Sequence, residues 1–511
     1  MKKGDKVRFL SEVGGGKVAG FQGKNIVLVE DEDGFEIPMP INEVVVVEQD
    51  DYAMGKMISA KMDAKQKAEE HANTELHQDS RRIKAILNEH ENDVDMNVEE
   101  YDAADRGLYM PEHIKKLPKD FFENIDKLSF QEIAYKVADA FFGEDIKADD
   151  LKRIVYDTLA FDCPIKEVEQ NIYSLELFHG PTLAFKDVGA RFMARMLQYF
   201  IREEGTKNVN VLVATSGDTG SAVANGFLGV EGIHVYVLYP KGKVSKIQES
   251  QFTTLGQNIT AIEVDGVFDD CQALVKQAFM DDELNKHMKL TSANSINVAR
   301  FLPQAFYYFY AYAQLKRIGK EHGYVICVPS GNFGNITAAI FGREMGLPVK
   351  RFIAANNAND IVYKYLQTGE YCPRPSIQTI ANAMDVGDPS NFARINDLFK
   401  GDWKKISSLM SGATYSNEQI RQTMRQCYDN NHYILDPHGA CGYQALKDLL
   451  LDGEVGVFGE TAHPAKFKDT VESAINAEVE IPERLAAFMK GEKKSIAMSK
   501  EFSDFKKLLE R

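Results

Sequence analysis

The chain has 511 residues, enough for two or three domains and a sizeable buried core. Its 76 acidic and 60 basic side chains give a formal charge of −16, which argues against nucleic acid or an anionic membrane as the main partner. No apolar stretch reaches the ~18 residues that a spanning helix needs, and the six cysteines show neither a disulfide framework nor a zinc-site spacing. We therefore expect a cytoplasmic protein that binds a small molecule and no metal, with its cysteines as reduced thiols in the core.

Residues 1–50 have the pattern of a small β module. Short apolar strings at 7–10, 26–29 and 44–47 alternate with turn-forming glycines, which is typical of a small antiparallel barrel or meander. The segment is weakly similar to the SH3-like barrels that precede other domains in some bacterial proteins.

Residues 51–105 are expected to form a charged helical or acidic linker. Ala, Lys, Glu and Gln are prominent up to about 90, and eight acidic side chains lie between Glu89 and Arg106. Such a composition repels itself and buries little apolar surface. We place the domain boundary here and treat 106–511 as one catalytic region.

The chain after 107 alternates between helix and strand patterns. Helical periodicity covers 128–142. Short apolar runs predict strands at 171–177, 209–214, 233–238, 259–264, 324–328, 351–355 and 454–458. This alternation predicts an α/β fold with mostly parallel sheets, in which ligands bind at the carboxyl ends of the strands.

The junction after the predicted strand 324–328 indicates a phosphate site. Ser330-Gly-Asn-Phe-Gly-Asn335 leads from the strand into a helix, and its two glycines let the backbone approach a ligand closely. An ordinary strand-to-helix turn is the alternative, whereas dinucleotide binding is less favoured because the G-x-G-x-x-G pattern is absent.

The junction after 209–214 is also rich in small polar side chains. Thr215, Ser216, Asp218, Thr219 and Ser221 crowd the first turn of the next helix. At least one of them is expected to cap the helix, but two such junctions in one sheet suggest two anionic groups bound side by side.

The junction after 171–177 carries a lysine in an apolar setting. Lys186 follows Leu183-Ala-Phe185 and opens a helix that continues through Arg191. A helix start and removal from water both lower the pKa of a lysine and favour the uncharged amine. Lys186 is therefore a candidate Schiff-base lysine, although most lysines are solvated surface groups.

Together the three junctions resemble those of the threonine synthase family, pyridoxal-phosphate (PLP) enzymes of fold type II in the tryptophan synthase β-like superfamily. The resemblance extends from about Arg106 to about Leu485. Eight segments carry it in the family's order: HGPTLAFKD (179–187), ATSGDTG (214–220), YPKGKVSKIQESQ (239–251), VDGVFDDCQ (264–272), SANSINVARFLPQ (292–304), PSGNFGN (329–335), ANAMDVGDPSNFAR (381–394) and ETAHPAKF (460–467). The resemblance implies two α/β domains with the cofactor between them. It also implies a carbon–oxygen lyase that converts O-phospho-L-homoserine and water to L-threonine and phosphate, the last step of threonine biosynthesis.

The resemblance also assigns roles to individual residues. Lys186 matches the catalytic lysine that bonds to the cofactor, and Thr461 is the candidate hydroxyl that faces the pyridine nitrogen. The loop around the cofactor phosphate matches Ser330, Gly331, Asn332, Phe333, Gly334 and Asn335. The residues expected around the substrate phosphate are Ser216, Thr219, Asn294, Ser295 and Arg300.

Several alternatives remain open from the sequence. Family members usually begin a few tens of residues before 107, where this chain has its acidic stretch, so an inactive fusion that acts as a binding module is one alternative. Another is a serine or threonine dehydratase of the same fold type. His179, His438 and His463 are expected to be scaffold residues, and 265–270 is expected to start a helix rather than bind metal. The sequence leaves the oligomeric state open.

Overall fold

The computed structural model describes residues 2–4, 6–9, 15–23, 26–30, 36–41, 44–46, 108, 110–111, 113–205, 208–293 and 297–510. The chain divides into two compact units, residues 1–80 and 81–511. The predicted linker at 51–105 lies outside the described residues.

The first unit contains a five-stranded antiparallel sheet. Its strands are β1 (Lys6–Phe9), β2 (Gly15–Gln22), β3 (Ile26–Glu30), β4 (Glu36–Pro40) and β5 (Val44–Val46), in the order β4-β3-β2-β1-β5. A small core lies on one face and consists of Val7, Val18, Val27, Val29, Met39 and Val44. The antiparallel meander predicted from the apolar strings is therefore present, and the SH3-like identity of this unit stays a prediction.

The larger of the two sheets in the second unit has six strands. In spatial order they are β14 (Met410–Thr414), β13 (Arg351–Asn356), β12 (Tyr324–Pro329), β15 (Val455–Glu460), β7 (Ile172–Glu176) and β6 (Ile165–Glu169). All neighbours are parallel except β6, which is antiparallel to β7. Along β12, Ile326 and Val328 belong to one buried cluster and Val325 and Cys327 to another, so both faces of this sheet are covered.

The other sheet of this unit has five parallel strands. They are β11 (Lys289–Ser292), β8 (Val209–Ala214), β9 (Ile233–Pro240), β10 (Ile259–Val264) and β16 (Ile496–Met498), in that spatial order. Val211 and Val213 of β8 join the same cluster as Ile326, whereas Leu212 joins a separate outer cluster. One continuous apolar core therefore connects the two sheets.

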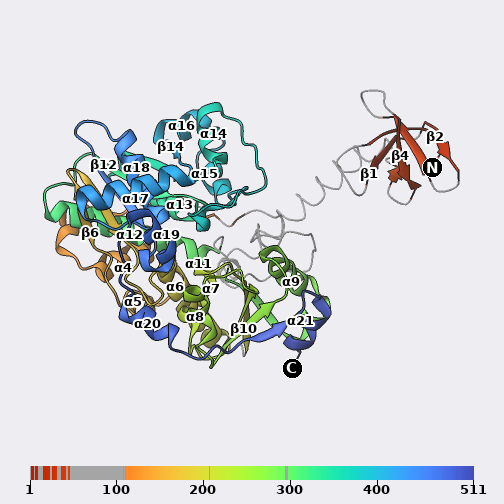
Figure 1. Ribbon diagram of the computed structural model, residues 1–511, viewed down its shortest axis with the longest axis horizontal. Helices are drawn as coiled ribbons and strands as arrows, with labels where there is room; N and C mark the ends of the chain where they lie inside the picture. The colour runs from red at the N-terminus through yellow and green to blue at the C-terminus, as the bar shows by residue number, and fades with distance from the viewer. Residues whose placement is uncertain are drawn as a thin grey trace. The chain divides into compact units, whose positions relative to one another are not determined.

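Helices cover both faces of each sheet (Figure 1). Those grouped with the six-stranded sheet are α4 (Phe130–Phe142), α12 (Ala305–Arg317), α13 (Gly334–Glu344), α14 (Ile361–Thr368), α15 (Phe392–Leu398), α16 (Trp403–Leu409), α17 (Asn417–Asn431), α18 (Pro437–Leu449) and α19 (Lys468–Ile475). Those grouped with the five-stranded sheet are α6 (Lys186–Glu204), α7 (Asp218–Phe227), α8 (Lys246–Thr253), α9 (Phe268–Met280), α10 (Asp282–His287), α20 (Glu483–Met489) and α21 (Phe502–Leu509). The remaining helices are α3 (Lys119–Asn124), α5 (Ala148–Thr158) and α11 (Val298–Phe301), with 3-10 turns at Ile125–Lys127, Leu302–Gln304, Asn382–Met384 and Pro464–Phe467.

The predicted α/β class with mostly parallel sheets is confirmed. All seven predicted strands are present with their ends within two residues of the expected positions, and the helix predicted at 128–142 is α4. One expectation was wrong: five cysteines are buried free thiols, but Cys372 is exposed, because it lies in an irregular segment between α14 and α15. None of the described helices is long and apolar enough to cross a membrane.

Candidate active site

The turn that carries Lys186 is tied to the loop after β15. The N–H of Phe185 donates to the carbonyl of Thr461 at 2.9 Å, and the N–H of His463 donates to the carbonyl of Leu183 at 3.0 Å. These bonds place Thr461, which is 7% exposed, beside the turn from which Lys186 begins α6. Lys186 and Thr461, both predicted to bind the cofactor, thus follow the carboxyl ends of β7 and β15 and belong to loops that contact each other.

Asp187, the residue after Lys186, holds the turn that precedes Lys186. The buried carboxylate of Asp187 accepts hydrogen bonds from the hydroxyl and the N–H of Thr182, at 2.6 and 2.9 Å. The backbone before and after Lys186 is therefore tied together by this contact.

The environment of Lys186 lowers the pKa of its amine. Burial is the largest cause. The nearby charges act in both directions: Asp218 raises this pKa, Arg300 and Lys466 lower it, and Asp436 raises it. The net direction favours the uncharged amine, as the sequence predicted, and an uncharged amine is the form that attacks carbonyl carbon.

The loop between β12 and α13 forms a tight cradle. A Cβ atom on Gly331 would lie 2.7 Å from the Cα of Met384, so the loop packs directly on the 3-10 turn at Asn382–Met384. Phe333 has a left-handed backbone (φ 61°), which is uncommon for a residue other than glycine and occurs at ligand sites. Helix α13 then starts at Gly334, and its first N–H groups have no carbonyl partners within the helix.

Asn335 gives this cradle a donor that suits a phosphate. Its side chain is 8% exposed, and its Oδ1 accepts a hydrogen bond from the hydroxyl of Tyr308. Its Nδ2 is buried and has no hydrogen-bond partner among the described residues. A buried donor without a partner at a helix N-terminus fits a bound phosphate group.

Two other residues of the predicted loop are engaged within the protein. Ser330 donates from its N–H to the carbonyl of Ala355 at 2.8 Å and from its hydroxyl to the carbonyl of Val328 at 2.9 Å. Asn332 accepts a hydrogen bond from the N–H of Ser390 through its Oδ1, at 2.7 Å. These contacts fix the cradle, so among the side chains of this loop Asn335 is the one placed to donate to a ligand.

The hydroxyl groups at the junction between β8 and α7 are of two kinds: some hydrogen-bond within the turn, and others have no described partner. Thr215 accepts from the N–H groups of Gly217 and Gly220 at 2.9 and 2.8 Å, and Ser221 donates to the carbonyl of Gly217 at 3.1 Å. Ser216 is exposed and Thr219 is half-buried, and neither makes a side-chain hydrogen bond to a described residue. The two hydroxyls predicted for substrate are therefore the ones left available.

Arg300 is a buried cation beside Lys186. It is 3% exposed, its Nη1 donates to the carbonyl of Ala293, and its Nε has no hydrogen-bond partner among the described residues. Burial lowers the pKa of Arg300 to about 10, so the guanidinium remains charged at neutral pH. A charged donor without a partner is suited to an anionic ligand. Asn294 and Ser295, predicted for the same ligand, lie outside the described residues.

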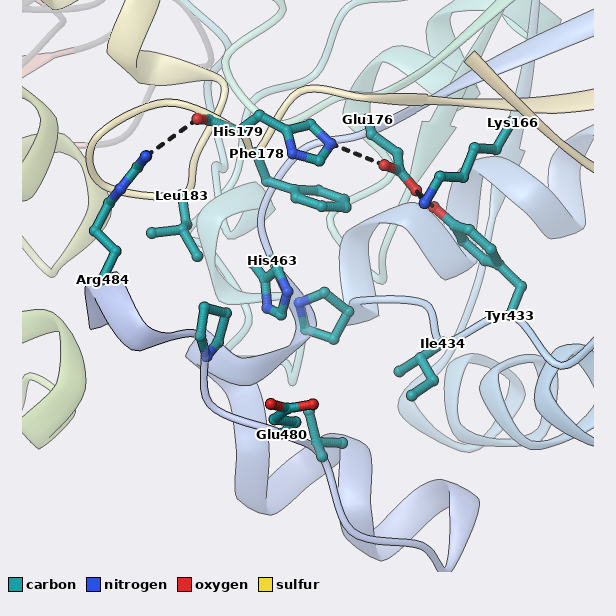
Figure 2. Close-up of a pocket in the computed structure, with 13 residues that line it drawn as sticks. Lys166, Glu176, Phe178, His179, Leu183, Tyr433, Ile434, His463, Glu480 and Arg484 are labelled. Atoms are coloured by element: carbon teal, nitrogen blue, oxygen red, sulfur yellow. Dashed lines mark hydrogen bonds and ion pairs between the residues drawn. The ribbon is translucent and has the colours of Figure 1, made fainter. Parts of the chain in front are cut away.

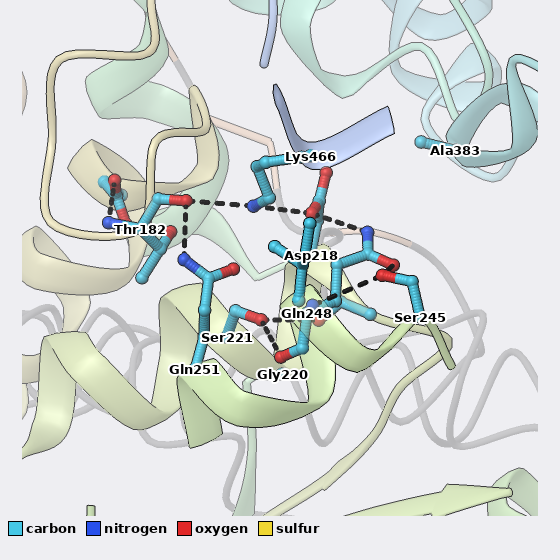
Figure 3. Close-up of polar contacts among 12 residues, drawn as sticks. Thr182, Asp218, Gly220, Ser221, Ser245, Gln248, Gln251, Ala383 and Lys466 are labelled. Atoms are coloured by element: carbon cyan, nitrogen blue, oxygen red, sulfur yellow. Dashed lines mark hydrogen bonds and ion pairs between the residues drawn. The ribbon is translucent and has the colours of Figure 1, made fainter. Parts of the chain in front are cut away.

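Asp218 and Lys466 form a buried ion pair to which the sequence analysis gave no role. Their Oδ1 and Nζ atoms lie 2.7 Å apart, and the Nε2 of Gln248 donates to the same carboxylate oxygen at 2.9 Å (Figure 3). Both residues lie inside quoted segments, ATSGDTG and ETAHPAKF. The available signal was a lysine five residues after the candidate Thr461, between Ala465 and Phe467.

The three histidines are hydrogen-bonded to the protein. His179 Nε2 lies 2.8 Å from Glu176, His438 Nδ1 contacts Asp436, and His463 Nδ1 accepts from the N–H of Ala465 at 3.1 Å. At the start of α9, Asp270 accepts from the N–H of Val267 at 2.8 Å, as expected for a helix start. Among the described residues, no group of three or more His, Cys, Asp or Glu side chains is arranged to hold a metal ion.

A separate pocket of about 630 Å³ is lined in part by residues that neighbour Lys186 and Thr461 in the sequence (Figure 2). Leu183 and His463 line it, together with Phe178 and Arg484, whose Nη1 donates to the carbonyl of Gly180 at 2.7 Å. Burial lowers the pKa of His463 to about 4, so its ring is uncharged at neutral pH. None of the residues predicted for cofactor or substrate lines this pocket.

Comparisons with known families cover most of the chain. The family described as "Pyridoxal-phosphate dependent enzyme" matches residues 155–457. "Threonine synthase N terminus" matches 97–159 and "Threonine synthase, C-terminal" matches 439–509. A domain of unknown function, DUF8465, matches 6–56. The match to the N-terminal threonine synthase segment thus begins within the acidic stretch. Part of the family's opening segment is therefore present in this chain.

Individual proteins that are similar to this chain are also threonine synthases. Threonine synthase of Haemophilus influenzae is 46% identical over 383 residues, which cover 75% of this chain and 88% of that protein. The crystal structure of threonine synthase from Escherichia coli matches with a TM-score of 0.74 and 42% identity, over 84% of this chain and 96% of that one. The PLP-bound threonine synthase from Brucella melitensis matches with a TM-score of 0.76 and 32% identity, over 83% of this chain and 95% of that one.

Proposed function

Because this chain belongs to the threonine synthase family of pyridoxal-phosphate-dependent enzymes, we propose that it converts O-phospho-L-homoserine and water to L-threonine and phosphate. The observation that carries the proposal is a pair of buried donors that have no hydrogen-bond partner among the described residues, Asn335 Nδ2 and Arg300 Nε, in the site that contains Lys186. The reaction needs places for two phosphate groups, one on the cofactor and one on the substrate.

The residues of the site fit the cofactor. Lys186 would hold the cofactor, while the first amides of α13 and Asn335 would bind its phosphate. Thr461 would face the pyridine nitrogen with a neutral hydroxyl. PLP, when bound, supplies a conjugated ring that delocalises the negative charge formed at the substrate carbons.

The substrate would occupy the space between the two sheets. The uncharged Nζ of Lys186 would remove the proton from the substrate Cα. Arg300, Ser216 and Thr219 would bind the phosphate at Cγ and stabilise the negative charge that develops on it as it leaves. Asn294 and Ser295 belong to the same proposed set.

Arg300→Ala tests the assignment of the substrate phosphate. We expect kcat/KM for O-phospho-L-homoserine to fall by about 100-fold, because a charged donor to the leaving group is lost. The variant should still show the absorption band of bound PLP, and borohydride reduction followed by peptide mapping should label Lys186. Lys447→Met, which breaks a half-exposed ion pair with Glu169, is the control that should keep wild-type turnover.

The same experiment separates the alternatives. A wild-type protein that binds no PLP would overturn the proposal in favour of a binding module. A protein that binds PLP but deaminates serine or threonine, with no threonine formed from O-phospho-L-homoserine, would assign it to the dehydratases. Unchanged turnover in Arg300→Ala would remove Arg300 from the site.

We further propose that the protein acts in the cytoplasm on this small molecule. All six cysteines are free thiols, which is typical of proteins in a reducing compartment.

A further inference from the structure

His438 is a buried histidine whose ring has a hydrogen-bond partner on each of its two nitrogen atoms. It is the second residue of α18 and is 2% exposed. Its Nδ1 contacts Oδ1 of Asp436, and its Nε2 accepts a hydrogen bond from the N–H of Ala383 at 3.2 Å. The ring of Phe467 packs edge-on against it, with the two ring centroids 5.0 Å apart. Three contacts therefore fix the position of the imidazole ring.

The two polar partners also fix the tautomer of His438. A backbone N–H can only donate, so Nε2 must accept with its lone pair. The proton of the neutral ring therefore lies on Nδ1, from which it is donated to the carboxylate of Asp436. A ring protonated on both nitrogens would direct its second N–H at the N–H of Ala383. The neutral ring with its proton on Nδ1 is thus the form that makes both contacts.

The accepting nitrogen reaches the turn on which the phosphate cradle packs. Ala383 is the middle residue of the 3-10 turn Asn382–Met384. Its N–H donates to His438, while its carbonyl oxygen would lie 2.9 Å from a Cβ atom on Gly331. The Cα of Met384 would lie 2.7 Å from the same Cβ atom. His438 is therefore bonded to the segment that limits how the backbone of Gly331 can lie.

Asp436 connects this contact to the other end of the proposed cofactor site. Its side chain caps α18 by accepting from the N–H groups of His438 and Gly439, at 2.7 and 3.3 Å. Its own N–H donates to Oε1 of Glu460 at 2.6 Å, and Glu460 is the last residue of β15, directly before Thr461. Both carboxylates are fully buried. A chain of contacts thus runs from the strand end that carries Thr461 to the turn under the phosphate cradle.

We propose that His438 is a positioning residue that holds the turn Asn382–Met384 in place, so that the loop after β12 keeps the shape that binds the cofactor phosphate. The inference rests on the proposed function in one respect: it assumes that this loop binds the phosphate of PLP. The ring acts through the backbone of Ala383, so its loss should weaken cofactor binding more than it slows turnover at saturating PLP.

Two substitutions separate the contacts of the two ring nitrogens. The amide oxygen of glutamine can accept at the position of Nε2, and the amide nitrogen of asparagine can donate from the position of Nδ1. His438→Gln should therefore keep the bond to Ala383 and lose the bond to Asp436, and His438→Asn should do the reverse. We titrate PLP into the full chain after its cofactor has been removed. We expect His438→Asn to bind PLP about tenfold more weakly than the wild type and His438→Gln to bind it within about threefold.

The order of the two variants distinguishes positioning from a purely structural role. If His438 served only to stabilise the start of α18, His438→Asn would be the milder change, because it keeps the bond to Asp436. Thermal unfolding of the cofactor-free proteins measures that role, and we expect His438→Gln to be the less stable of the two. The phosphorus NMR signal of bound PLP should shift in His438→Asn and not in His438→Gln. PLP affinities that follow the order of stability, or that are equal in the two variants, would overturn the inference.

A third variant keeps the test decisive if His438→Asn does not fold. His438→Met keeps neither bond, whereas His438→Gln keeps only the bond to Ala383. The difference in PLP affinity between these two variants therefore isolates the contact with Ala383, and we again expect about tenfold. Equal affinities would overturn the inference.

His234 provides a matched control. It is a half-buried histidine in β9, and its Nε2 lies 2.9 Å from Oγ1 of Thr260. His234→Gln and His234→Asn should both bind PLP as the wild type does. Threonine formation by the wild type, with no difference in PLP affinity among the His438 variants, would overturn this inference alone. The expected order of affinities in a protein that forms no threonine from O-phospho-L-homoserine would overturn the proposed function alone.

Discussion

Glu454 shows how a single carboxylate is held outside the active site. Its side chain is 0% exposed, and Arg351 binds it through two N–H groups at 2.6 and 3.0 Å while Lys350 lies 3.0 Å away. Burial raises the pKa of Glu454, but hydrogen bonds from Arg351, the N–H of Leu451 and Lys350 lower this pKa to about 2. The carboxylate therefore remains charged in the folded protein far below the pH at which it would be protonated in the unfolded chain.

We expect Glu454→Gln to lower the free energy of unfolding by about 2 kcal/mol at pH 7. The folded-state pKa is the lower one, so the stabilisation is complete above about pH 4.5 and is lost as the pH falls toward 2. Urea unfolding of both proteins at pH 7, 5 and 3.5 measures the difference. The gap between them should be constant from pH 7 to 5 and smaller at 3.5. Asp429→Asn, at an exposed pair with Arg425, should change stability little at any pH.

The sequence predicted those site residues whose signal is local. Lys186, Ser216, Thr219 and the loop from Ser330 to Asn335 each lie at a strand-to-helix junction, and such junctions can be recognised from a few neighbouring residues. The contact between Asp218 and Lys466 joins positions 248 residues apart, so no local pattern indicates it. For the same reason the sequence did not show which hydroxyl at this junction is structural. Thr215 hydrogen-bonds within the turn, whereas the hydroxyl of Ser216 has no partner among the described residues.

At the scale of elements, the four described strands of the second unit that were not predicted are the edge strands of its two sheets. They are β6, β11, β14 and β16. Each has only three to five residues, and β6, β11 and β14 lack a continuous apolar run. An edge strand has a neighbour on one side only, so it needs fewer apolar residues. Central strands such as β12 are buried along their whole length, and this is the pattern that apolar runs predict.

The junction between β12 and α13 gives a prediction at this scale. Gly331→Ala would place a Cβ atom 2.7 Å from the Cα of Met384 and 2.9 Å from the carbonyl oxygen of Ala383. Backbone atoms cannot rotate away, so the loop must move away from the turn at Asn382–Met384. We expect PLP to bind at least about tenfold more weakly, measured by titration of its absorption band.

Gly459→Ala is the matched control for this change. It also adds a methyl group near the site, in β15, but the nearest atoms would lie 3.7 Å away, which is ordinary contact. It should bind PLP as the wild type does. Equal affinities for Gly331→Ala and wild type would show that the cradle does not depend on this close approach.

At the scale of the molecule, the alternation of helix and strand patterns predicts the α/β class, whereas the division into two sheets was implied by the family resemblance and not by that alternation. Strand order depends on contacts between distant segments: β16 lies near the end of the chain, yet it pairs with β10 in a sheet built from 209–292. Likewise β7 lies beside β15, so that the turn of Lys186 meets the loop of Thr461. The largest apolar cluster includes residues from both sheets, so the two sheets share one core.

Removal of residues 1–80 tests how far the second unit is independent. Every described residue of the proposed site lies between Lys186 and Lys466, and the core of the first unit is a separate cluster around Val27 and Val29. We therefore expect the shortened protein, 81–511, to fold, to bind PLP and to form threonine with kcat/KM within about threefold of the full chain. Steady-state kinetics with O-phospho-L-homoserine and thermal unfolding of both proteins measure this. A fall in kcat/KM of more than about tenfold at unchanged thermal stability would assign the first unit a part in catalysis, because a protein that keeps its fold but loses turnover has lost more than a carried domain.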